Sequence, residues 1–284
     1  MAEPHTDAAR LVTTVIMTRN RKPELLASMV HHSGPVIIVD NGSTDGTADA
    51  VAQRFPETRV LRLDTNAGAS ARNFGVEMAA TAYVAFSDDD SWWAPDALRV
   101  AASVLERNPR LGLIAAQVLV GSEQRLDSMC ATMAESPLPT LDGIAGRQVT
   151  GFIACGSVVR REAFLQAGGF DTVVFFPGEE ERVALDLATA GWLLGYVPAV
   201  IAYHHPASRP TSRMRERLIA RNHILTAVMR RSWREVAARV LAVCRSTQGP
   251  PALFGALLRL PRALAVRRPV PPAVDALWRQ TAPR

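Results

Sequence analysis

The chain has 284 residues, of which 48% are hydrophobic and 21% are charged. This composition is typical of a globular protein, and it excludes a disordered or a fibrous chain. The three cysteines, Cys130, Cys155 and Cys244, are far apart, which argues against a disulfide framework and indicates a reducing cytoplasm. No apolar run approaches the roughly 20 residues of a membrane span, so we expect a soluble or peripherally attached protein.

Charge is distributed unevenly along the chain. Residues 1–204 carry 16 basic and 24 acidic side chains, a net charge of −8, whereas residues 205–284 carry 16 basic and 3 acidic ones, a net charge of +13. A basic tail on an acidic body predicts contact with an anionic surface. We expect that surface to be a membrane and expect no nucleic acid partner. The alternative is a helical subdomain or an oligomer interface whose arginines face solvent.

Apolar runs rich in β-branched residues alternate with helical patterns as far as His204. Strands are expected at 11–17, 35–39, 59–63, 83–86, 111–120, 152–160 and 192–203. Helices are expected after Pro23, at 44–55, with Thr44 or Asp45 as the cap, and at 66–80, 95–108, 161–167 and 179–190. This alternation predicts βαβ units and a mostly parallel sheet, which is an α/β fold.

The chain divides into three parts on this pattern. Residues 1–10 are polar and are expected to be a flexible N-terminus without a signal peptide. Residues 11–208 are expected to form the α/β domain, within which 121–148 is expected to be a mobile loop. Residues 209–284 are expected to form a basic helical extension.

Prolines are frequent in the last forty residues. They are expected to break the end of the extension into short pieces, at Pro250, Pro251, Pro261, Pro269, Pro271 and Pro272. Within this part, residues 253–262 combine pairs of leucines with Arg259 and Arg262. Such a basic amphipathic segment is suited to an anionic membrane surface.

Three consecutive carboxylates, Asp88, Asp89 and Asp90, follow the strand expected at 83–86. Like charges at this spacing are unfavourable unless water or a cation compensates them. The C-terminal edge of a parallel sheet is also where α/β proteins bind ligands. We therefore expect a divalent metal, Mg²⁺ or Mn²⁺, that bridges to a diphosphate. The alternative is a solvated acidic loop.

Four segments, in this order, resemble the family 2 glycosyltransferases with a GT-A fold. They are 18–21, 39–47, 66–75 together with 86–90, and 170–204 with its Glu179-Glu180 pair. The resemblance covers about residues 11–230, and Arg221-Asn222 also resembles the rhamnosyltransferase-like members. It implies a Rossmann-like, mostly parallel central sheet with flanking helices, here followed by the C-terminal helical extension.

The resemblance also implies roles for particular residues. Glu180, beside Glu179, matches the general base, which is an Asp in the family, so Glu180 keeps the carboxylate and adds one methylene. Asp90 matches the direct metal ligand, with Asp88 and His204 beside the metal. The residues implied to bind the nucleotide sugar are Thr18, Arg19, Asn20, Asp40, Asn66, Gly68, Arg72, Asp88 and Asp89.

Ordinary structural roles are the alternatives for most of these residues. Asp40 would accept an Asx-turn hydrogen bond, and residues 179–181 would stabilise the N-terminus of a helix. Arg72 would form a surface salt bridge, and His204 would simply pack or face solvent. Two further pairs have no assigned role in binding: Trp92 and Trp93, which would stack on a sugar or lie in the core, and Arg182 and Asp186, expected to form a salt bridge.

These observations lead us to expect an inverting, metal-dependent glycosyltransferase. It would move a sugar from a nucleoside diphosphate donor to a hydroxyl of a glycan or lipid-linked acceptor of the cell envelope. We expect it in the cytoplasm, in peripheral contact with the inner face of the cytoplasmic membrane. One alternative is an inactive scaffold that binds nucleotide sugars. The other is a sugar nucleotidyltransferase, for which the loop at 18–23 lacks the necessary glycines.

Overall fold

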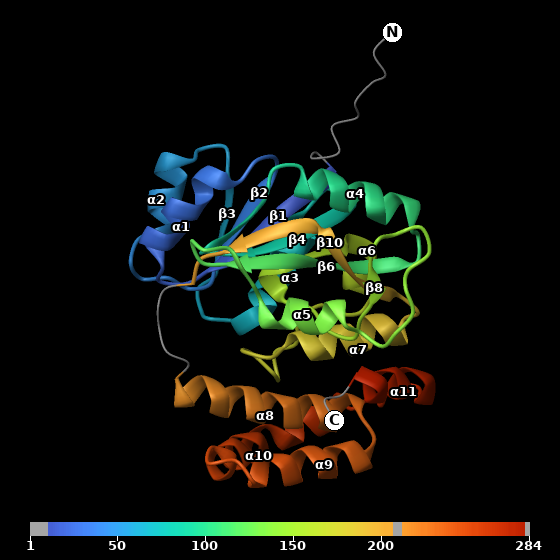
Figure 1. Cartoon of the computed structure of the whole chain (residues 1–284). Helices are drawn as coiled ribbons and strands as arrows, with labels where there is room; N and C mark the ends of the chain where they lie inside the picture. Colours follow the sequence, from blue (N-terminus) through green and yellow to red (C-terminus); the bar gives the residue numbers. More distant parts are fainter. Residues whose placement is uncertain (1–10, 207–211, 282–284) are drawn as a thin grey trace.

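The computed structural model describes residues 11–206 and 212–281. The expected flexible segment 1–10 and the expected boundary between residues 208 and 209 lie outside this described part. Figure 1 shows a central sheet with helices on both faces and, beneath it, a layer of C-terminal helices. The α/β fold and the helical extension predicted from the sequence are therefore confirmed.

The strands form one mixed sheet. Their bounds are β1 Val12–Thr18, β2 Val36–Asp40, β3 Arg59–Arg62, β4 Tyr83–Asp88, β5 Ser91–Trp93, β6 Leu111–Val120, β7 Arg125–Leu126, β8 Arg147–Gln148, β9 Ser157–Arg160 and β10 Leu193–His204. The order is β3-β2-β1-β4-β9-β6-β10-β5, with β7 on β6 and β8 on β10. The strands β3, β2, β1 and β4 are parallel, and β9 is antiparallel to both β4 and β6. Because β1, β2 and β4 run in the same direction, their C-terminal ends meet at one edge.

Helices cover both faces of the sheet and form the lower layer. Their bounds are α1 Lys22–Ser28, α2 Thr47–Arg54, α3 Ala71–Met78, α4 Ala97–Arg107, α5 Ser128–Ala134, α6 Arg161–Gln166, α7 Glu180–Thr189, α8 Arg213–Arg230, α9 Trp233–Cys244, α10 Gly249–Ala265 and α11 Pro272–Thr281. In Figure 1, α1, α2 and α4 lie above the sheet, and α3, α5 and α7 lie below it. The layer of α8 to α11 follows beneath α7, so α7 connects the sheet domain to the extension.

Three local expectations are wrong. The segment 121–148 is not simply a loop, because it contains α5, β7 and β8. A helix of seven residues with two buried side chains, Cys130 and Met133, is too short to give a clear periodic pattern. Residues 154–156 form a 3₁₀ turn, so β9 begins later than expected. The short strand β5 was not expected, and it pairs with β10.

The extension contains longer helices than its prolines predict. Helix α10 includes Pro250, Pro251 and Pro261 without a break. The first two lie in the first turn, where a backbone N–H has no helical partner and proline is tolerated. Helices α8, α9 and α10 share an apolar core of their own, which includes Ile224, Leu225 and Ala256. Among the described helices, none has both the length and the apolar composition of a membrane span.

Several arginines of the extension form ion pairs with the sheet domain or within the layer. Arg239 binds Glu181 of α7, with Nη1 2.8 Å from Oε2. Asp186 binds Arg230 and also the expected partner Arg182, at 2.8 Å, so the predicted Arg182–Asp186 salt bridge is confirmed. These arginines therefore face neither solvent nor a membrane, and part of the basic charge fixes the extension to α7.

Candidate functional site

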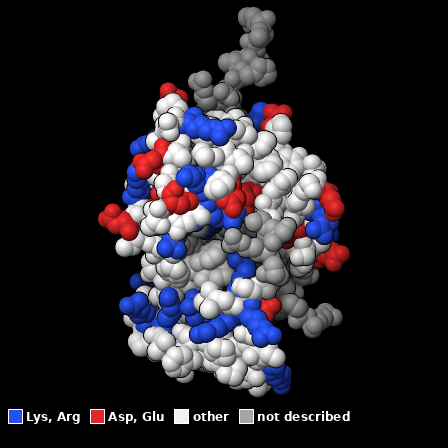
Figure 2. Space-filling model, turned by 90° about the vertical axis from the view of Figure 1, so that its left-hand side faces the viewer, with Lys and Arg blue, Asp and Glu red and all other residues white. Residues whose placement is uncertain are grey.

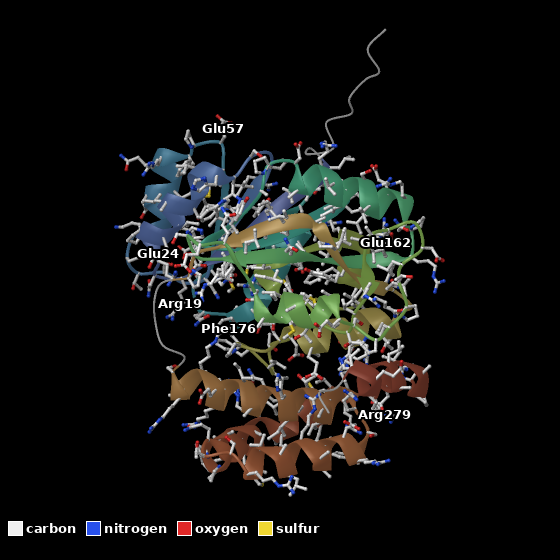
Figure 3. The ribbon with its side chains drawn as sticks, viewed as in Figure 1. Arg19, Glu24, Glu57, Glu162, Phe176 and Arg279 are labelled. Carbon is white, nitrogen blue, oxygen red and sulfur yellow. The ribbon has the colours of Figure 1, made fainter. Side chains whose placement is uncertain are left out.

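A cavity of about 900 Å³ opens at the edge where β1 and β4 end. It is lined by residues of the β1 exit, by Asn66, Gly68 and Arg72, by Asp88 to Asp90, by Phe175 and Phe176, by His204 and by the start of α8. In Figure 3, Arg19 and Phe176 lie on the same side of the molecule, above the first turn of α8. We call this space the central cavity. Asn41, after β2, also lines it, so the cavity collects residues from seven separate parts of the chain.

One arginine neutralises two of the three aspartates. Arg21 donates from Nε to Asp89 and from Nη2 to Asp90, both at 2.6 Å. Asp89 is buried and also accepts a hydrogen bond of 3.1 Å from the Thr18 hydroxyl. Burial raises the pKa of Asp89 to about 7, although the charge of Arg21 lowers it. Thr18 and Asp89 therefore lie together as predicted, and Arg21 is a site residue that the predicted set lacked.

The third aspartate, Asp88, is held by a buried arginine. Arg72 is 1% exposed, and its Nη2 lies 2.6 Å from Asp88 Oδ1. Its Nη1 lies 3.4 Å from Glu179 Oε1, and its guanidinium lies over the Phe170 ring. The surface salt bridge considered for Arg72 is therefore wrong. Arg72 joins the carboxylate at the end of β4 to the carboxylate that precedes α7.

Asp88 and His204 offer ligand atoms to a common point. One atom each of Asp88, Cys155 and His204 lies within 4.8 Å of the other two. A carboxylate suits Mn²⁺ or Mg²⁺, whereas an imidazole is a ligand of transition metals, so the pair favours Mn²⁺ over Mg²⁺, with the remaining positions left to water or phosphate. Burial and the charge of Asp88 raise the pKa of the Cys155 thiol well above its usual value. The donor set thus fits a divalent metal held by Asp88 and His204, with a neutral thiol as the wall.

Asp90 contacts both His204 and Arg21. Its Oδ1 is 3.3 Å from His204 Nε2, and its other oxygen is held by Arg21. Burial lowers the pKa of His204, but the hydrogen bond and the charge of Asp90 outweigh it, and the pKa is raised. The assignment of Asp90 as the direct metal ligand stays a prediction, because this geometry gives Asp88 at least as good a position.

The glutamate pair lies at the N-terminus of α7, where Glu179 is the cap and Glu180 is the first residue. Burial and the charge of Glu180 raise the pKa of Glu179 to about 8, while Arg72 lowers it. Burial also raises the pKa of Glu180, with Asp88 adding to the rise and backbone N–H groups opposing it. Glu181 differs, because Arg239 lowers its pKa despite burial. Glu181 forms an ion pair with Arg239, which is a structural role, and the roles of Glu179 and Glu180 stay predictions.

The remaining predicted residues shape the loops around the central cavity. Arg19, Asn66 and Gly68 line it. Asn20 accepts a hydrogen bond of 2.7 Å from the Thr44 N–H, and Asp40 accepts one of 3.0 Å from the Ser43 N–H. Asp40 therefore makes the Asx-type contact considered as its alternative. Among the described residues, Asn20, Asp40, Glu179 and Glu180 do not line the cavity.

Asn41 and Phe175 also line the cavity and were not among the predicted site residues. Asn41 is buried, donates to the Gly68 carbonyl at 3.0 Å and accepts from the Ala67 N–H at 2.7 Å. Phe175 has φ +72°, which is strained for an aromatic residue, and its carbonyl accepts from the Ala69 N–H at 2.8 Å. A polar residue directly after the Asp at a strand end was the available signal for Asn41. Nothing in the sequence signals the conformation of Phe175.

The contact between Gly68 and Phe175 gives a first testable prediction. Gly68 has φ +63°, and a Cβ there would lie 2.7 Å from the Phe175 ring and carbonyl. We expect Gly68→Ala to lower the free energy of unfolding by about 1–3 kcal/mol and to distort the cavity wall. Urea denaturation measures the first effect. Gly143→Ala is the control, because Gly143 also has positive φ, +68°, but has open space around it. An equal loss in both variants would contradict the role of the Phe175 contact.

Comparisons with known proteins agree with this arrangement. The family model of glycosyl transferase family 2 matches residues 14–167, which is more than half of the chain. An N-acetylglucosaminyl-diphospho-decaprenol L-rhamnosyltransferase of Mycobacterium tuberculosis is 30% identical over 205 residues. That match covers 61% of this chain and 66% of the relative, just under two thirds of its length. A putative teichuronic acid biosynthesis glycosyltransferase of Bacillus subtilis, TuaG, is 38% identical over 95 residues, which are 31% of this chain and 38% of the relative.

Two solved structures share the fold. The mannosyltransferase PcManGT of Pyrobaculum calidifontis, in complex with GDP-Man and Mn²⁺, superposes with a TM-score of 0.59 at 22% identity, covering 95% of this chain and 78% of the other. Residues 1–349 of S. aureus TarS superpose with a TM-score of 0.58 at 16% identity, covering 94% and 82%. The GT-A fold expected from the sequence is thereby confirmed. The chain belongs to glycosyl transferase family 2.

Proposed function

We propose that the chain transfers a sugar, with inversion, from a nucleoside diphosphate donor to a hydroxyl of a lipid-linked glycan acceptor. The observation that carries the proposal is the buried Arg72, which joins Asp88 at the end of β4 to Glu179 at the start of α7. This contact supports the proposal because it connects Asp88, a proposed metal ligand, with Glu179, the residue next to the proposed base. The central cavity beside it has room for a nucleotide sugar.

The residues divide the chemistry between them. Asp88 and His204, with Asp90 beside them, would hold a divalent metal, which when bound neutralises the diphosphate leaving group. Thr18, Arg19 and Asn66 line the side on which the nucleotide would lie. Asn20 and Asp40 accept hydrogen bonds from the backbone of the loop that follows β2, and they would keep the shape of this loop and of the β1 exit. Arg21 keeps the charges of Asp89 and Asp90 compensated, so these carboxylates stay in place before a ligand arrives.

Glu180 is the proposed general base. It would accept the proton of the acceptor hydroxyl as that oxygen attacks the anomeric carbon, on the side opposite to the leaving diphosphate. The raised pKa of Glu180 makes its carboxylate a better proton acceptor than an ordinary glutamate. Glu179 directly precedes Glu180 and binds Arg72, and this contact would fix the position of Glu180. A lipid-linked acceptor is supported by the name of the Mycobacterium tuberculosis relative, whose acceptor is a diphospho-decaprenol.

Nucleotide binding tests the proposal directly. We expect one class of nucleoside diphosphate to raise the melting temperature in the presence of Mn²⁺, because a ligand at 100 times its Kd stabilises the native state by about 2.7 kcal/mol. Asp88→Asn should remove the part of this shift that depends on Mn²⁺. Asp96→Asn is the control, since Asp96 is exposed and Asn tolerates its positive φ of +62°. If no nucleoside diphosphate shifts the wild type, the proposed donor class is wrong.

Transfer itself separates the enzyme from an inactive scaffold. The wild type should release nucleoside diphosphate from one nucleotide sugar in a reaction that requires Mn²⁺ or Mg²⁺. A protein that binds the nucleotide but never turns over any nucleotide sugar would support the scaffold instead.

A further inference from the structure

Four arginines on α8 and α10 differ from the arginines of the extension that bind acidic side chains. They are Arg215, Arg217, Arg221 and Arg259. Within the described residues, none of them forms an ion pair with a carboxylate, whereas Arg230, Arg231 and Arg239 all do. We call these four residues the arginine cluster.

Arg221 lies in a place that is built for it. Its side chain packs on Gly255 of α10, where a Cβ would lie 3.1 Å from Arg221 Cδ. Its Nη2 donates to the Val174 carbonyl at 3.3 Å, and its Nε donates to Asn222 Oδ1 at 2.8 Å. Burial and, to a smaller extent, the positive charge of Arg259 lower the pKa of Arg221 to about 10. Within the described residues no carboxylate binds this cation, so an external anion would stabilise it.

The cluster is continuous with the central cavity. Arg259 donates to the Val173 carbonyl at 2.7 Å, and its guanidinium lies 5.8 Å from the centre of the Phe175 ring. Arg215 lines the central cavity and lies 5.6 Å from the centre of the Phe176 ring. The segment 173–176 therefore has the cavity on one side and the arginines on the other. An anion bound by the cluster would lie next to the proposed donor site.

An apolar stripe follows the arginines on α10. Phe254, Leu257 and Leu258 are 61%, 63% and 69% exposed, and their spacing places them on one face of the helix. Figure 2 shows Lys and Arg side chains in a belt across the C-terminal helices, with mostly uncharged side chains beneath that belt. Arginines at the level of the headgroups and large apolar side chains below them are the arrangement of a helix that lies in a membrane interface.

We propose that the arginine cluster binds the phosphate groups of the lipid-linked acceptor while the α10 stripe enters the apolar layer of the membrane. The guanidinium fork of arginine fits phosphate oxygens in pairs, and the stripe explains why the phosphate would belong to a lipid. The inference rests on the proposed function and adds the place where the acceptor is held.

Vesicle flotation tests the inference with the full chain. The probes are phosphatidylcholine vesicles alone, the same vesicles with phosphatidylglycerol, and vesicles with a polyprenyl diphosphate at matched surface charge. We expect the wild type to bind the polyprenyl diphosphate vesicles most tightly. The double variant Arg221→Ala/Arg259→Ala should bind them about thirtyfold more weakly, about fivefold for each of the two arginines near an anionic surface. Leu257→Ser/Leu258→Ser should weaken binding to all vesicles.

The control has the same loss of charge elsewhere. Arg99→Ala/Arg125→Ala removes two exposed arginines of the sheet domain and should bind as the wild type does. If the alanine pair does not fold, Arg221→Lys/Arg259→Lys keeps the charge but loses the fork, and it should still lose the preference for polyprenyl diphosphate. Equal binding to both anionic vesicles by the wild type, or unchanged binding by the cluster variants, would overturn the inference. A wild type that binds these vesicles but turns over no nucleotide sugar would instead overturn the proposed function.

Discussion

Glu180→Gln should lose nearly all sugar transfer and keep nucleotide binding. Glutamine has almost the same shape as glutamate but cannot accept the proton of the acceptor hydroxyl. A positioned general base contributes about 100- to 10,000-fold to a rate, so kcat should fall within that range. Steady-state kinetics with the identified donor measure the loss, and the thermal shift with nucleoside diphosphate and Mn²⁺ verifies that the donor site is intact.

The pH dependence gives the same residue a second test. A base must be ionised to act, and burial raises the pKa of Glu180 above that of an ordinary glutamate. In the wild type, kcat should therefore rise with pH through a limb that lies above about 4.5, the usual region for a glutamate. Glu180→Asp should keep measurable transfer, because it retains a carboxylate, whereas Glu180→Gln should lose the limb together with the activity.

Glu162→Gln is the matched control for the glutamine variant. Glu162 is exposed on α6, well away from the central cavity (Figure 3). Its replacement should leave kcat and the pH limb unchanged. Transfer by Glu180→Gln at more than a tenth of the wild-type rate would show that another group takes the proton. Glu179 would then be the first candidate, since its pKa is raised to about 8.

The sequence predicts the sheet well because strand cores such as 83–86 are uninterrupted apolar runs. Their parallel order also predicts that Thr18 and the aspartates after β4 meet, and they do, through the hydrogen bond from Thr18 to Asp89. What the run of aspartates cannot show is how its charge is divided. Arg21 takes Asp89 and Asp90, and Arg72 takes Asp88. That division depends on side-chain directions, which no local pattern contains.

The extension shows a different limit of sequence reasoning. Composition alone reveals an excess of arginine, but it does not show which arginines are paired. The partners of Arg239 and Arg230 are Glu181 and Asp186, which lie 58 and 44 residues earlier in the chain. Tertiary contacts at such separations distinguish the arginines that bind acidic side chains, some of which fix the extension to α7, from the arginine cluster on α8 and α10.

This attachment has a consequence for the site. Helix α7 begins at Glu180, and its next residue, Glu181, is held by Arg239 of α9. The proposed base therefore lies on an element that the sheet domain and the extension both hold in place. Contact of the extension with a membrane would thus be mechanically connected to the residue that receives the acceptor proton.

Arg72→Met should be the most destabilising single substitution in the site. Arg72 is fully buried and is the cation that compensates both Asp88 and Glu179. Methionine fills part of the volume of the arginine side chain but leaves the carboxyl groups of Asp88 and Glu179 without a compensating cation. Removing one partner of a buried ion pair costs about 3–5 kcal/mol. Urea denaturation should show a loss of that size, and transfer activity should disappear with it. Arg62→Met, at an exposed pair with Asp49, should change the free energy of unfolding by less than about 1 kcal/mol.

The loss should depend on pH in a defined direction. Glu179 has a pKa raised to about 8 in the folded protein, so it binds a proton more strongly there than in the unfolded chain. Its contribution to stability is therefore complete below about 4.5 and is lost as the pH rises towards 8. Without Arg72 the ionised form of Glu179 is disfavoured further, so the pKa of Glu179 in the variant should lie above its wild-type value, and the variant should keep losing stability at pH values where the wild type no longer does. The part of the difference that Glu179 causes should be small below about pH 7 and should grow above about pH 8.

A double-mutant cycle separates this electrostatic cause from a packing defect. Glu179→Gln in the Arg72→Met background removes one of the uncompensated carboxylates, so it should restore part of the lost stability and flatten the pH dependence. In the wild-type background the same substitution removes a partner of Arg72 and should not stabilise the protein to the same extent. The interaction free energy between the two positions measures their coupling. A coupling near zero, with a loss that is equal below about pH 7 and above about pH 8, would mean that Arg72 contributes volume rather than charge.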